Sequence, residues 1–219
     1  MDRDGFVAET GVSRETADRL AELEALLNRW NPRINLVARS TLKHFWARHV
    51  LDSWQVLEHA PPAPSLWLDL GSGGGFPGLI IALCGDRPVT LVESDARKCA
   101  FLREAARHLG LAVTIENRRI ETLPTVLGDR RADVISARAL AALPKLLGWA
   151  APLLSPGGKL ILLKGQDVES ELTEATKYWK FDHELFGSRS DSGGAVLVIE
   201  GLRQHDHLPD PDLRSDPGA

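Results

Sequence analysis

The feature that constrains this chain most is a glycine-rich turn between two short apolar stretches. The apolar run at residues 66–70 leads into the segment DLGSGGGFPG at residues 69–78, and residues 79–83 are apolar again. Glycines permit the positive φ of a tight turn and lack the Cβ atoms that would hold a ligand away, and Pro77 suits a first helical turn. The pattern predicts a strand, a turn and a helix, with backbone passing close to a ligand.

An acidic residue follows at the distance that a nucleoside site needs. Glu93 ends the next apolar run, 22 residues after Gly71. Nucleotide-binding α/β folds place at this point a carboxylate that accepts hydrogen bonds from the ribose hydroxyls. An ordinary glycine turn beside an exposed Glu is the alternative. Because strand, turn, helix and acid occur in the right order, we favour the nucleoside site.

Two cofactors compete for this site. Residues 73–78 satisfy the dinucleotide pattern G-x-G-x-x-G, so an NAD-dependent oxidoreductase is the alternative. The strand ends at Leu70, however, so the first glycine of the turn is Gly71. The sixth position of the pattern is then Phe76, and a phenylalanine cannot give the close helix–strand packing that the last glycine of the dinucleotide pattern allows. Asp69 would repel a pyrophosphate but suits the ammonium and sulfonium charges of S-adenosylmethionine. The pattern favours S-adenosylmethionine.

The rest of the chain alternates short apolar runs with helical stretches, which is typical of an α/β fold with a mostly parallel sheet. The best-marked helices are expected at residues 96–109 and 143–154. Seven strands are expected, at residues 66–70, 89–93, 112–116, 133–137, 159–163, around 181 and at 195–200.

The N-terminal part is expected to be helical. Ser13 is a plausible N-cap for an amphipathic helix that ends at Asn31-Pro32, and a second helical stretch covers residues 45–57. We therefore expect a helical cap at residues 1–62, a Rossmann-like domain at residues 63–202 and a flexible acidic, proline-rich tail at residues 203–219.

Charge is unevenly distributed along the chain. The net charge is -4, yet residues 28–50 contain five Lys or Arg and three aromatic residues and no Asp or Glu. This composition indicates an RNA-facing surface, with Trp30 and Trp46 near a bound base. The alternative is a solvated helical face with both tryptophans in the core. The basic residues are Arg29, Arg33, Arg39, Lys43 and Arg48.

Composition excludes several other classes of protein. With 43% hydrophobic and 26% charged residues, the chain is within the range of globular proteins. Its two cysteines have neither a metal-site spacing nor the density of a disulfide framework. We see no apolar run long enough to span a bilayer and no targeting segment, so we expect a cytoplasmic protein without a membrane partner.

Six motifs in order resemble the bacterial small-subunit ribosomal RNA guanine-N7 methyltransferase G family, also called glucose-inhibited division protein B. The similarity covers roughly residues 28–166, and the family's Asn-Leu-Thr is Asn-Leu-Val here. The motifs are NLV at 35–37, RHVLDS at 48–53, DLGSGGGFPG at 69–78, RKCAFLR at 97–103, ISARA at 135–139 and LKG at 163–165.

The resemblance implies a class I methyltransferase fold with a final antiparallel strand and an S-adenosylmethionine cofactor. It also implies methylation of a guanine N7 in the 530 loop of 16S ribosomal RNA, with the RNA or the small ribosomal subunit as partner. No stable protein partner is implied, and we expect a monomer. A methyltransferase acting on protein or a small molecule is the main alternative. Charge reversal of the basic residues would distinguish the two.

The resemblance places the family's cofactor contacts on Gly71, Phe76, Ile120, Glu121 and Arg138. To these the glycine turn and the distal acid add Gly73, Gly75 and Glu93. Ile120 and Glu121 would flank the adenine, and Arg138 would pair with the methionine carboxylate or approach the target base. We expect no metal.

No catalytic acid or base is expected, because guanine N7 is unprotonated and attacks the sulfonium methyl directly. His49 and Asp52 share a helix face, as either a general-base pair or a packing pair, and we favour packing. The target base should be unpaired, since the major groove of A-form RNA is too narrow for side chains. Candidate RNA-backbone contacts outside residues 28–50 are Arg97, Lys98, Arg118, Arg119 and Lys164.

Overall fold

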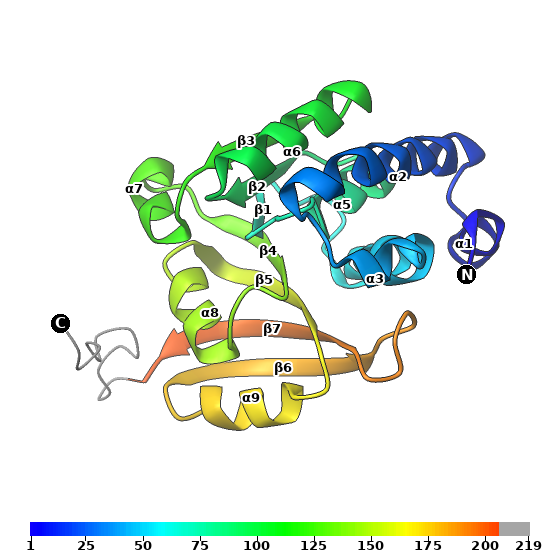
Figure 1. Cartoon of the computed structure of the whole chain (residues 1–219). Coiled ribbons are helices and arrows are strands. Elements are labelled where there is room, and N and C mark those ends of the chain that lie inside the picture. The colour runs from blue at the N-terminus through cyan, green and yellow to red at the C-terminus, as the bar shows by residue number, and fades with distance from the viewer. Residues whose placement is uncertain (206–219) are drawn as a thin grey trace.

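The computed structural model describes residues 1–205 and is built on a seven-stranded mixed sheet (Figure 1). The strand order is β3-β2-β1-β4-β5-β7-β6. Strands β1 to β5 are parallel, and β7 runs antiparallel to both of its neighbours. The α/β class, the seven strands and the antiparallel final strand are therefore confirmed. The strands are β1 Trp67–Leu70, β2 Val89–Glu93, β3 Val113–Asn117, β4 Ala132–Arg138, β5 Leu154–Lys164, β6 Trp179–Gly187 and β7 Ala195–Gln204.

Helices cover both faces of the sheet, and each face has its own apolar core. Side chains alternate across β1, so that Trp67 packs in the core beneath α5 and α6 while Leu68 packs in the core beneath α8. Because both faces are covered, the central strands read as continuous apolar runs. The helices that follow the first strand are α5 Gly78–Gly85, α6 Ala96–His108, η3 Ile120–Thr122, α7 Leu123–Leu127, α8 Leu143–Ala150 and α9 Val168–Ala175.

The N-terminal helices add a further layer outside α5 and α6 (Figure 1). Leu20, Leu23 and Leu27 of α2 are fully buried and share the core of that sheet face. Ser13 caps α2 as predicted, with its Oγ accepting from the Thr16 N–H at 3.0 Å. The helices of this layer are α1 Arg3–Thr10, α2 Arg14–Ile34, α3 Arg39–Leu42, η1 Trp46–Leu51, α4 Asp52–Trp54 and η2 Gln55–His59.

The predicted end of the first long helix was wrong. Helix α2 continues through Pro32 to Ile34 and ends at Asn35, which takes a left-handed φ of 47°. A proline in the last turn removes only one backbone donor, so the helix tolerates it there. The buried amide of Asn31 accepts from the Val37 N–H at 2.9 Å and donates to the Val37 carbonyl at 3.0 Å. These two bonds fix the chain as it leaves the helix.

The second predicted helical stretch is irregular. It starts with a π-helical turn, η1, passes through α4 and ends as the 3-10 helix η2. Single π-helical turns inside helices are rare and often occur at functional sites. Here the wider turn contains His49, which is buried, and Asp52 follows directly after it.

The far end of the chain returns to these N-terminal helices. Strands β6 and β7 form a long hairpin, and its loop at residues 188–194 lies against α4 and η2. Strand β7 extends to Gln204, opposite Trp179, so residues 203 and 204, which were predicted to start the tail, belong to this strand. The remainder of that predicted tail, residues 206–219, lies outside the described residues.

Candidate active site

The glycine turn forms at the carboxyl end of β1, as predicted. Gly71 and Gly73 take positive φ values of 65° and 55°. The Ser72 N–H donates to the Val92 carbonyl at 3.0 Å, so the turn bends over the end of β2. The Gly73 N–H donates at 2.9 Å to Glu93, whose other carboxylate oxygen accepts from the Asp95 N–H at 2.8 Å. The distal acid therefore holds the turn in place.

Asp69 lies beneath this turn and does not line the cavity above it. Its fully buried carboxylate accepts from Ser136 Oγ at 2.8 Å and from the Gly78 N–H at 3.2 Å. Burial raises the pKa of Asp69 to about 6, although three hydrogen bonds and Arg138 oppose the rise. The sequence argument placed this charge against the ligand, whereas in the structure the carboxylate supports the turn and the start of α5.

The glycine at position 78 corrects one argument against a dinucleotide. A Cβ on Gly78 would overlap Leu91 of β2 and lie 2.7 Å from Asp69 Oδ2, so this glycine gives the close helix–strand contact that the sequence reading denied to the turn. The count from Gly71 to Phe76 was therefore not decisive. The sheet instead argues against a dinucleotide-binding fold, because its strand order and its antiparallel β7 differ from the dinucleotide-binding order 3-2-1-4-5-6.

A cavity of about 1140 Å³ opens above the turn. It lies at the carboxyl ends of the parallel strands, where ligands bind in open α/β sheets. Seven of the eight predicted cofactor residues line it, namely Gly71, Gly73, Phe76, Glu93, Ile120, Glu121 and Arg138. Gly75 does not. It packs inward, where a Cβ would overlap Leu79 and press on Leu102, so its role is in the core.

Ile120 and Glu121 come together with Glu93 at one end of this cavity. The Arg118 N–H donates to the Glu93 carbonyl at 3.1 Å, which joins the segment after β3 to the end of β2. Helix η3 then presents an apolar side chain, that of Ile120, beside an exposed acidic one, that of Glu121. This end of the cavity offers apolar surface together with hydrogen-bond acceptors.

Arg138 leaves the end of β4 and lies in a dense cluster with residues 48–52. Its guanidinium donates to the Arg48 carbonyl at 3.0 Å, to His49 Nδ1 at 3.1 Å and to Asp52 Oδ2 at 3.4 Å. It also lies over the Phe76 ring, 5.0 Å from the ring centre. Burial lowers the pKa of Arg138 from its usual value, while the charge of Asp52 raises it. The cluster orients one partly buried cation toward the cavity.

His49 is a neutral member of this cluster. Because a guanidinium only donates, His49 Nδ1 must accept, and Nε2 then carries the proton and donates to Thr41 Oγ1 at 2.9 Å. Burial, together with the charges of Arg138 and Arg48, lowers the pKa of His49 to about 3. Both ring nitrogens are engaged and the protonated form is disfavoured. These contacts agree with the packing role that we favoured over a general base.

The basic segment at residues 28–50 has the predicted cations on its surface but not the predicted aromatics. Arg33, Arg39 and Lys43 are exposed. Phe45 and Trp46 are buried, and Trp46 Nε1 donates to Glu24 at 3.2 Å. Trp30 packs edge-on against Phe101 of α6. The aromatic half of the RNA-stacking prediction was therefore wrong, because these rings anchor the N-terminal helices to the sheet layer.

The predicted RNA contacts outside this segment have different environments. Lys98 and Arg119 line the cavity, and Arg97 is exposed beside Asp95. Arg118 is paired with Glu116 at 2.8 Å. Lys164 also lines the cavity, but only 8% of its side chain is exposed, and its Nζ donates to Glu171 at 2.6 Å and to the Ala141 carbonyl at 3.2 Å. Lys164 therefore fixes the α8–α9 corner, and its predicted contact with RNA stays a prediction.

Sequence reasoning missed one contributor to the cavity, the β6–β7 loop. Asp191 and Gly194 line the cavity, and Asp191 forms an ion pair with Arg48 across it. No spacing in the sequence connects residue 191 with residue 48. A serine- and glycine-rich hairpin turn at residues 188–194 was the available signal, and it does not indicate which distant helix the loop contacts.

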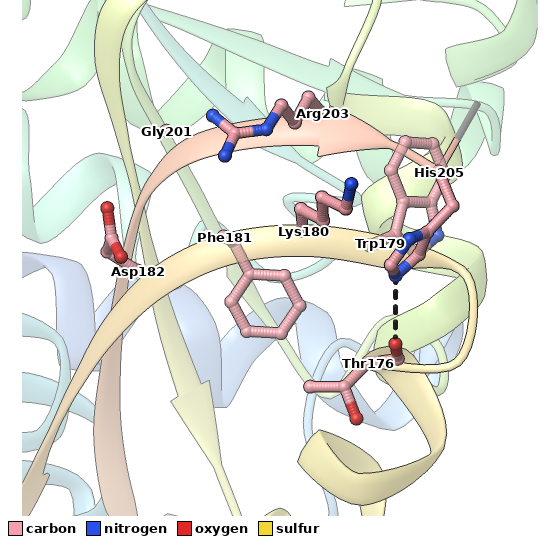
Figure 2. Close-up of a pocket in the computed structure, with 8 residues that line it drawn as sticks. All are labelled: Thr176, Trp179, Lys180, Phe181, Asp182, Gly201, Arg203 and His205. Carbon is pink, nitrogen blue, oxygen red and sulfur yellow. Dashed lines mark hydrogen bonds between the residues drawn. The ribbon is translucent and has the colours of Figure 1, made fainter.

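A second, smaller cavity of about 300 Å³ lies at the other end of the same hairpin. Figure 2 shows Lys180, Phe181 and Asp182 from β6 and Arg203 from β7 around it. His205 bonds the Thr176 carbonyl at 3.1 Å on its rim. None of the predicted site residues lines this cavity, so it is separate from the candidate active site.

Two negative findings hold for the described part of the chain. Among residues 1–205, no helix combines the length and the apolar character that crossing a bilayer requires. The same residues contain no group of three His, Cys, Asp or Glu side chains placed to hold a metal ion.

Two solved structures illustrate the similarity in fold. A methyltransferase from Pyrococcus furiosus has a TM-score of 0.51 at 18% identity, covering 67% of this chain and 79% of that one. A putative transferase from Pyrococcus horikoshii has a TM-score of 0.54 at 18% identity, covering 77% and 64%. With the strand order and the cavity, these likenesses define the class I S-adenosylmethionine-dependent methyltransferase fold.

The particular family follows from sequence similarity. The chain belongs to the GidB family, described as rRNA small subunit methyltransferase G, which it matches over residues 16–205. A ribosomal RNA small subunit methyltransferase G from Parvibaculum lavamentivorans is 49% identical over 213 residues, or 95% of this chain and 93% of the relative. One from Gluconobacter oxydans is 47% identical, covering 89% of this chain and 98% of the relative. The family that the motifs indicated is thus confirmed.

Proposed function

We propose that this protein transfers a methyl group from S-adenosylmethionine to N7 of a guanine in the 530 loop of 16S ribosomal RNA. The observation that carries the proposal is the cavity of about 1140 Å³ between the glycine turn and residues 36–52, in a chain of the rRNA small subunit methyltransferase G family. One wall suits a nucleoside, and the other belongs to the segment with exposed Arg and Lys.

The residues at the turn fit the nucleoside half of this cofactor. Each Glu93 oxygen accepts one backbone N–H and retains a second lone pair, so the carboxylate can still accept from the ribose hydroxyls. Ile120 offers an apolar face for the adenine, and Glu121 and its backbone lie beside it. Gly71 and Gly73 let the backbone approach the ligand. A similarly folded protein, TYW2 from Pyrococcus horikoshii, was solved in complex with MeSAdo, at a TM-score of 0.50 and 19% identity.

Arg138 and Phe76 fit the amino-acid half. The guanidinium is a partly buried cation in the cavity lining and would pair with the carboxylate of the cofactor's methionine part. Phe76, buried beneath the guanidinium, supplies an apolar wall. His49 and Asp52 hold the guanidinium and need not touch the cofactor.

The reaction needs placement of two atoms and no proton transfer by the protein. When bound, the cofactor would supply an electrophilic methyl carbon on a sulfonium; the N7 lone pair would attack that carbon in line, and the sulfur would depart as a neutral thioether. The protein contributes by holding the base in place and by excluding water. Such positioning lowers the activation barrier by up to roughly 7–11 kcal/mol in favourable cases. His49 is neutral and forms a hydrogen bond at each ring nitrogen, which is consistent with a site that has no general base.

The RNA would approach over the N-terminal helices. N7 is reachable only in an unpaired or splayed guanine, so the target should lie in a loop. Arg33, Arg39 and Lys43 would hold its backbone, with Lys98 and Arg119 at the cavity. We accordingly propose residues 1–62 as the RNA-facing element and residues 63–202 as the methyltransferase domain.

Mapping of N7-methylguanine tests the proposed reaction directly. Borohydride and aniline cleave RNA at this base, so 16S RNA from cells with the protein should show a cleavage site in the 530 loop that RNA from cells without it lacks. An identical cleavage pattern in the two RNAs would contradict the assigned target.

Charge reversal separates an RNA substrate from a protein or small-molecule substrate. The triple variant Arg33→Glu, Arg39→Glu, Lys43→Glu should retain cofactor affinity and lose RNA methylation, because phosphate contacts dominate RNA affinity. A matched triple, Arg107→Glu, Arg130→Glu, Arg131→Glu, changes exposed cations outside the cavity lining and should retain activity. Full activity in the first triple would exclude this surface as the RNA contact.

A further inference from the structure

We propose that Ser190, in the loop between β6 and β7, is a positioning residue for Arg138 and acts through Asp52. The inference deepens the proposed function, because it concerns the cation that would meet the cofactor. It assigns a role in the active site to a loop that is more than 130 residues from Asp52 in sequence.

The contacts form a continuous chain from the loop to the cavity. Ser190 Oγ donates to Asp52 Oδ1 at 2.7 Å. The other carboxylate oxygen, Oδ2, accepts from Arg138 Nη1 at 3.4 Å. Ser188 Oγ lies 3.5 Å from the same Oδ1 and 2.9 Å from Ser190 Oγ. One carboxylate thus joins two hydroxyls to one guanidinium.

The short bond is the one on the serine side. The Asp52–Arg138 contact, at 3.4 Å, is long for a charge-assisted hydrogen bond. This contact alone leaves the carboxylate free to rotate about the Cβ–Cγ bond of Asp52. The 2.7 Å bond from Ser190 removes that freedom, because it fixes Oδ1 and therefore the direction of Oδ2. Only 19% of the Asp52 side chain and 18% of the Arg138 side chain are exposed, so water replaces these bonds poorly.

The loop that carries Ser190 is itself anchored. The Arg189 N–H donates to Gln55 Oε1 at 2.7 Å. Its guanidinium pairs with Glu9 of α1 and with Glu58 of η2 at 2.9 Å, and it lies 5.4 Å from the centre of the Trp54 indole. Because residue 189 is held on four sides, its neighbour has a defined position relative to the helix that contains Asp52. The anchored loop therefore holds the Ser190 hydroxyl in place beside Asp52.

A structural role and a positioning role predict different results. If Ser190 only attaches the loop to the helices, its removal lowers the unfolding temperature and acts independently of Arg138. If it positions Arg138, its removal changes the property that depends on Arg138 and has no effect once Arg138 is absent. Coupling between the two side chains is therefore the deciding measurement.

The test compares Ser190→Ala with Ser192→Ala by titration of S-adenosylhomocysteine in a calorimeter. Ser192 is exposed in the same loop and makes no hydrogen bond to another residue of the described chain, so it is a matched control. We expect Ser190→Ala to weaken binding about threefold to tenfold, as for loss of one bond to a charged group, and Ser192→Ala to leave it unchanged. Ser190→Thr, which keeps the hydroxyl, should restore most of the affinity.

The double-mutant cycle decides between the two roles. On the background of Arg138→Ala, Ser190→Ala should change binding less than about twofold. The same cycle on Asp52→Ala gives a second route to this result if the first background does not fold, as judged by its unfolding temperature. Independent, multiplicative effects in these cycles, or equal effects of the two serine variants, would overturn the inference. Failure of the wild type to methylate 16S RNA, with the coupling intact, would instead overturn the proposed substrate.

Discussion

The two walls of the cavity are built in different ways. The wall at the glycine turn is formed by backbone from one short segment, residues 69–78, fixed by hydrogen bonds to Glu93 and Asp69. The opposite wall is formed by the side chains of His49, Asp52 and Arg138, and Arg138 is 86 or more residues from the other two in sequence. The first wall is determined by local sequence, whereas the second requires the whole fold to be in place.

This difference explains how much of the site the sequence could predict. The turn demands glycine at positions of positive φ, and that demand is visible in the residues themselves. The second wall has no local signal, because charged and polar residues such as Ser190 are common on any surface. Its residues were identified in part through family resemblance, and the β6–β7 loop was not identified at all.

The largest effect is expected at the first wall, from Gly71→Val. A β-branched residue at a φ of 65° is strained, and its Cβ would overlap Leu140. We expect S-adenosylhomocysteine to bind about a hundredfold more weakly in calorimetry. Gly110→Ala is the control, since Gly110 has a φ of 59° but no atom within 4 Å of the added Cβ. A Gly71 variant that binds normally would show that backbone shape is not what this wall provides.

At the second wall, Arg138→Lys should weaken the same binding about tenfold, because an ammonium cannot reproduce the paired geometry of a guanidinium. Arg107→Lys, at an exposed surface pair with Glu104, is the matched change. If Arg138→Lys were as damaging as Gly71→Val, the two walls would not differ as proposed. No change at all would remove Arg138 from the cofactor site.

A smaller effect is expected from Glu93→Gln. The amide keeps one acceptor oxygen but turns an N–H group toward either the Gly73 or the Asp95 N–H. We expect binding to weaken about threefold to fivefold, with the turn retained. Glu104→Gln on α6 is the control. An effect above that of Arg138→Lys would show that side chains matter more at the first wall than its backbone.

The last prediction concerns a different property, the pH dependence of stability, in which the two walls should differ in sign. His49 has a pKa of about 3 in the folded chain and near 6.5 when unfolded, so it favours folding above pH 6.5 and this gain is lost as pH falls toward 3. Asp69 has a folded pKa of about 6 against 3.8, so its gain is present below pH 3.8 and is lost as pH rises through 6.

Urea unfolding between pH 4 and pH 7 measures these terms. His49→Gln should flatten the loss of stability toward low pH, and Asp69→Asn should steepen it. Equal pH profiles for the wild type and His49→Gln would show that the histidine is not held neutral.

Most of the sheet was predictable from the sequence. The errors occurred where contacts between residues far apart in sequence determine the end of a helix or the environment of a side chain. Strand β2 was predicted with its observed bounds, because a short apolar run and a following helix leave local signals. Helix α2 extended past Pro32 because Asn31 bonds Val37. Lys164 is paired with Glu171 and Trp46 is buried against α1, and neither contact has a sequence pattern. Gly75 packs against Leu79 and Leu102 and does not line the cavity, which only the neighbouring side chains reveal.

The anchoring of Arg189 to Glu9 has a consequence for the newly made chain. These two residues are 180 positions apart, so a ribosome must translate almost the whole described sequence before the hairpin can meet the first helix. The glycine turn and its first partners, up to Glu93, are translated well before that. A nascent chain can therefore form the nucleoside half of its site early, yet it gains the Ser190–Asp52 contact only after the last hairpin has been made. The second wall would therefore be complete only after the β6–β7 hairpin has been translated.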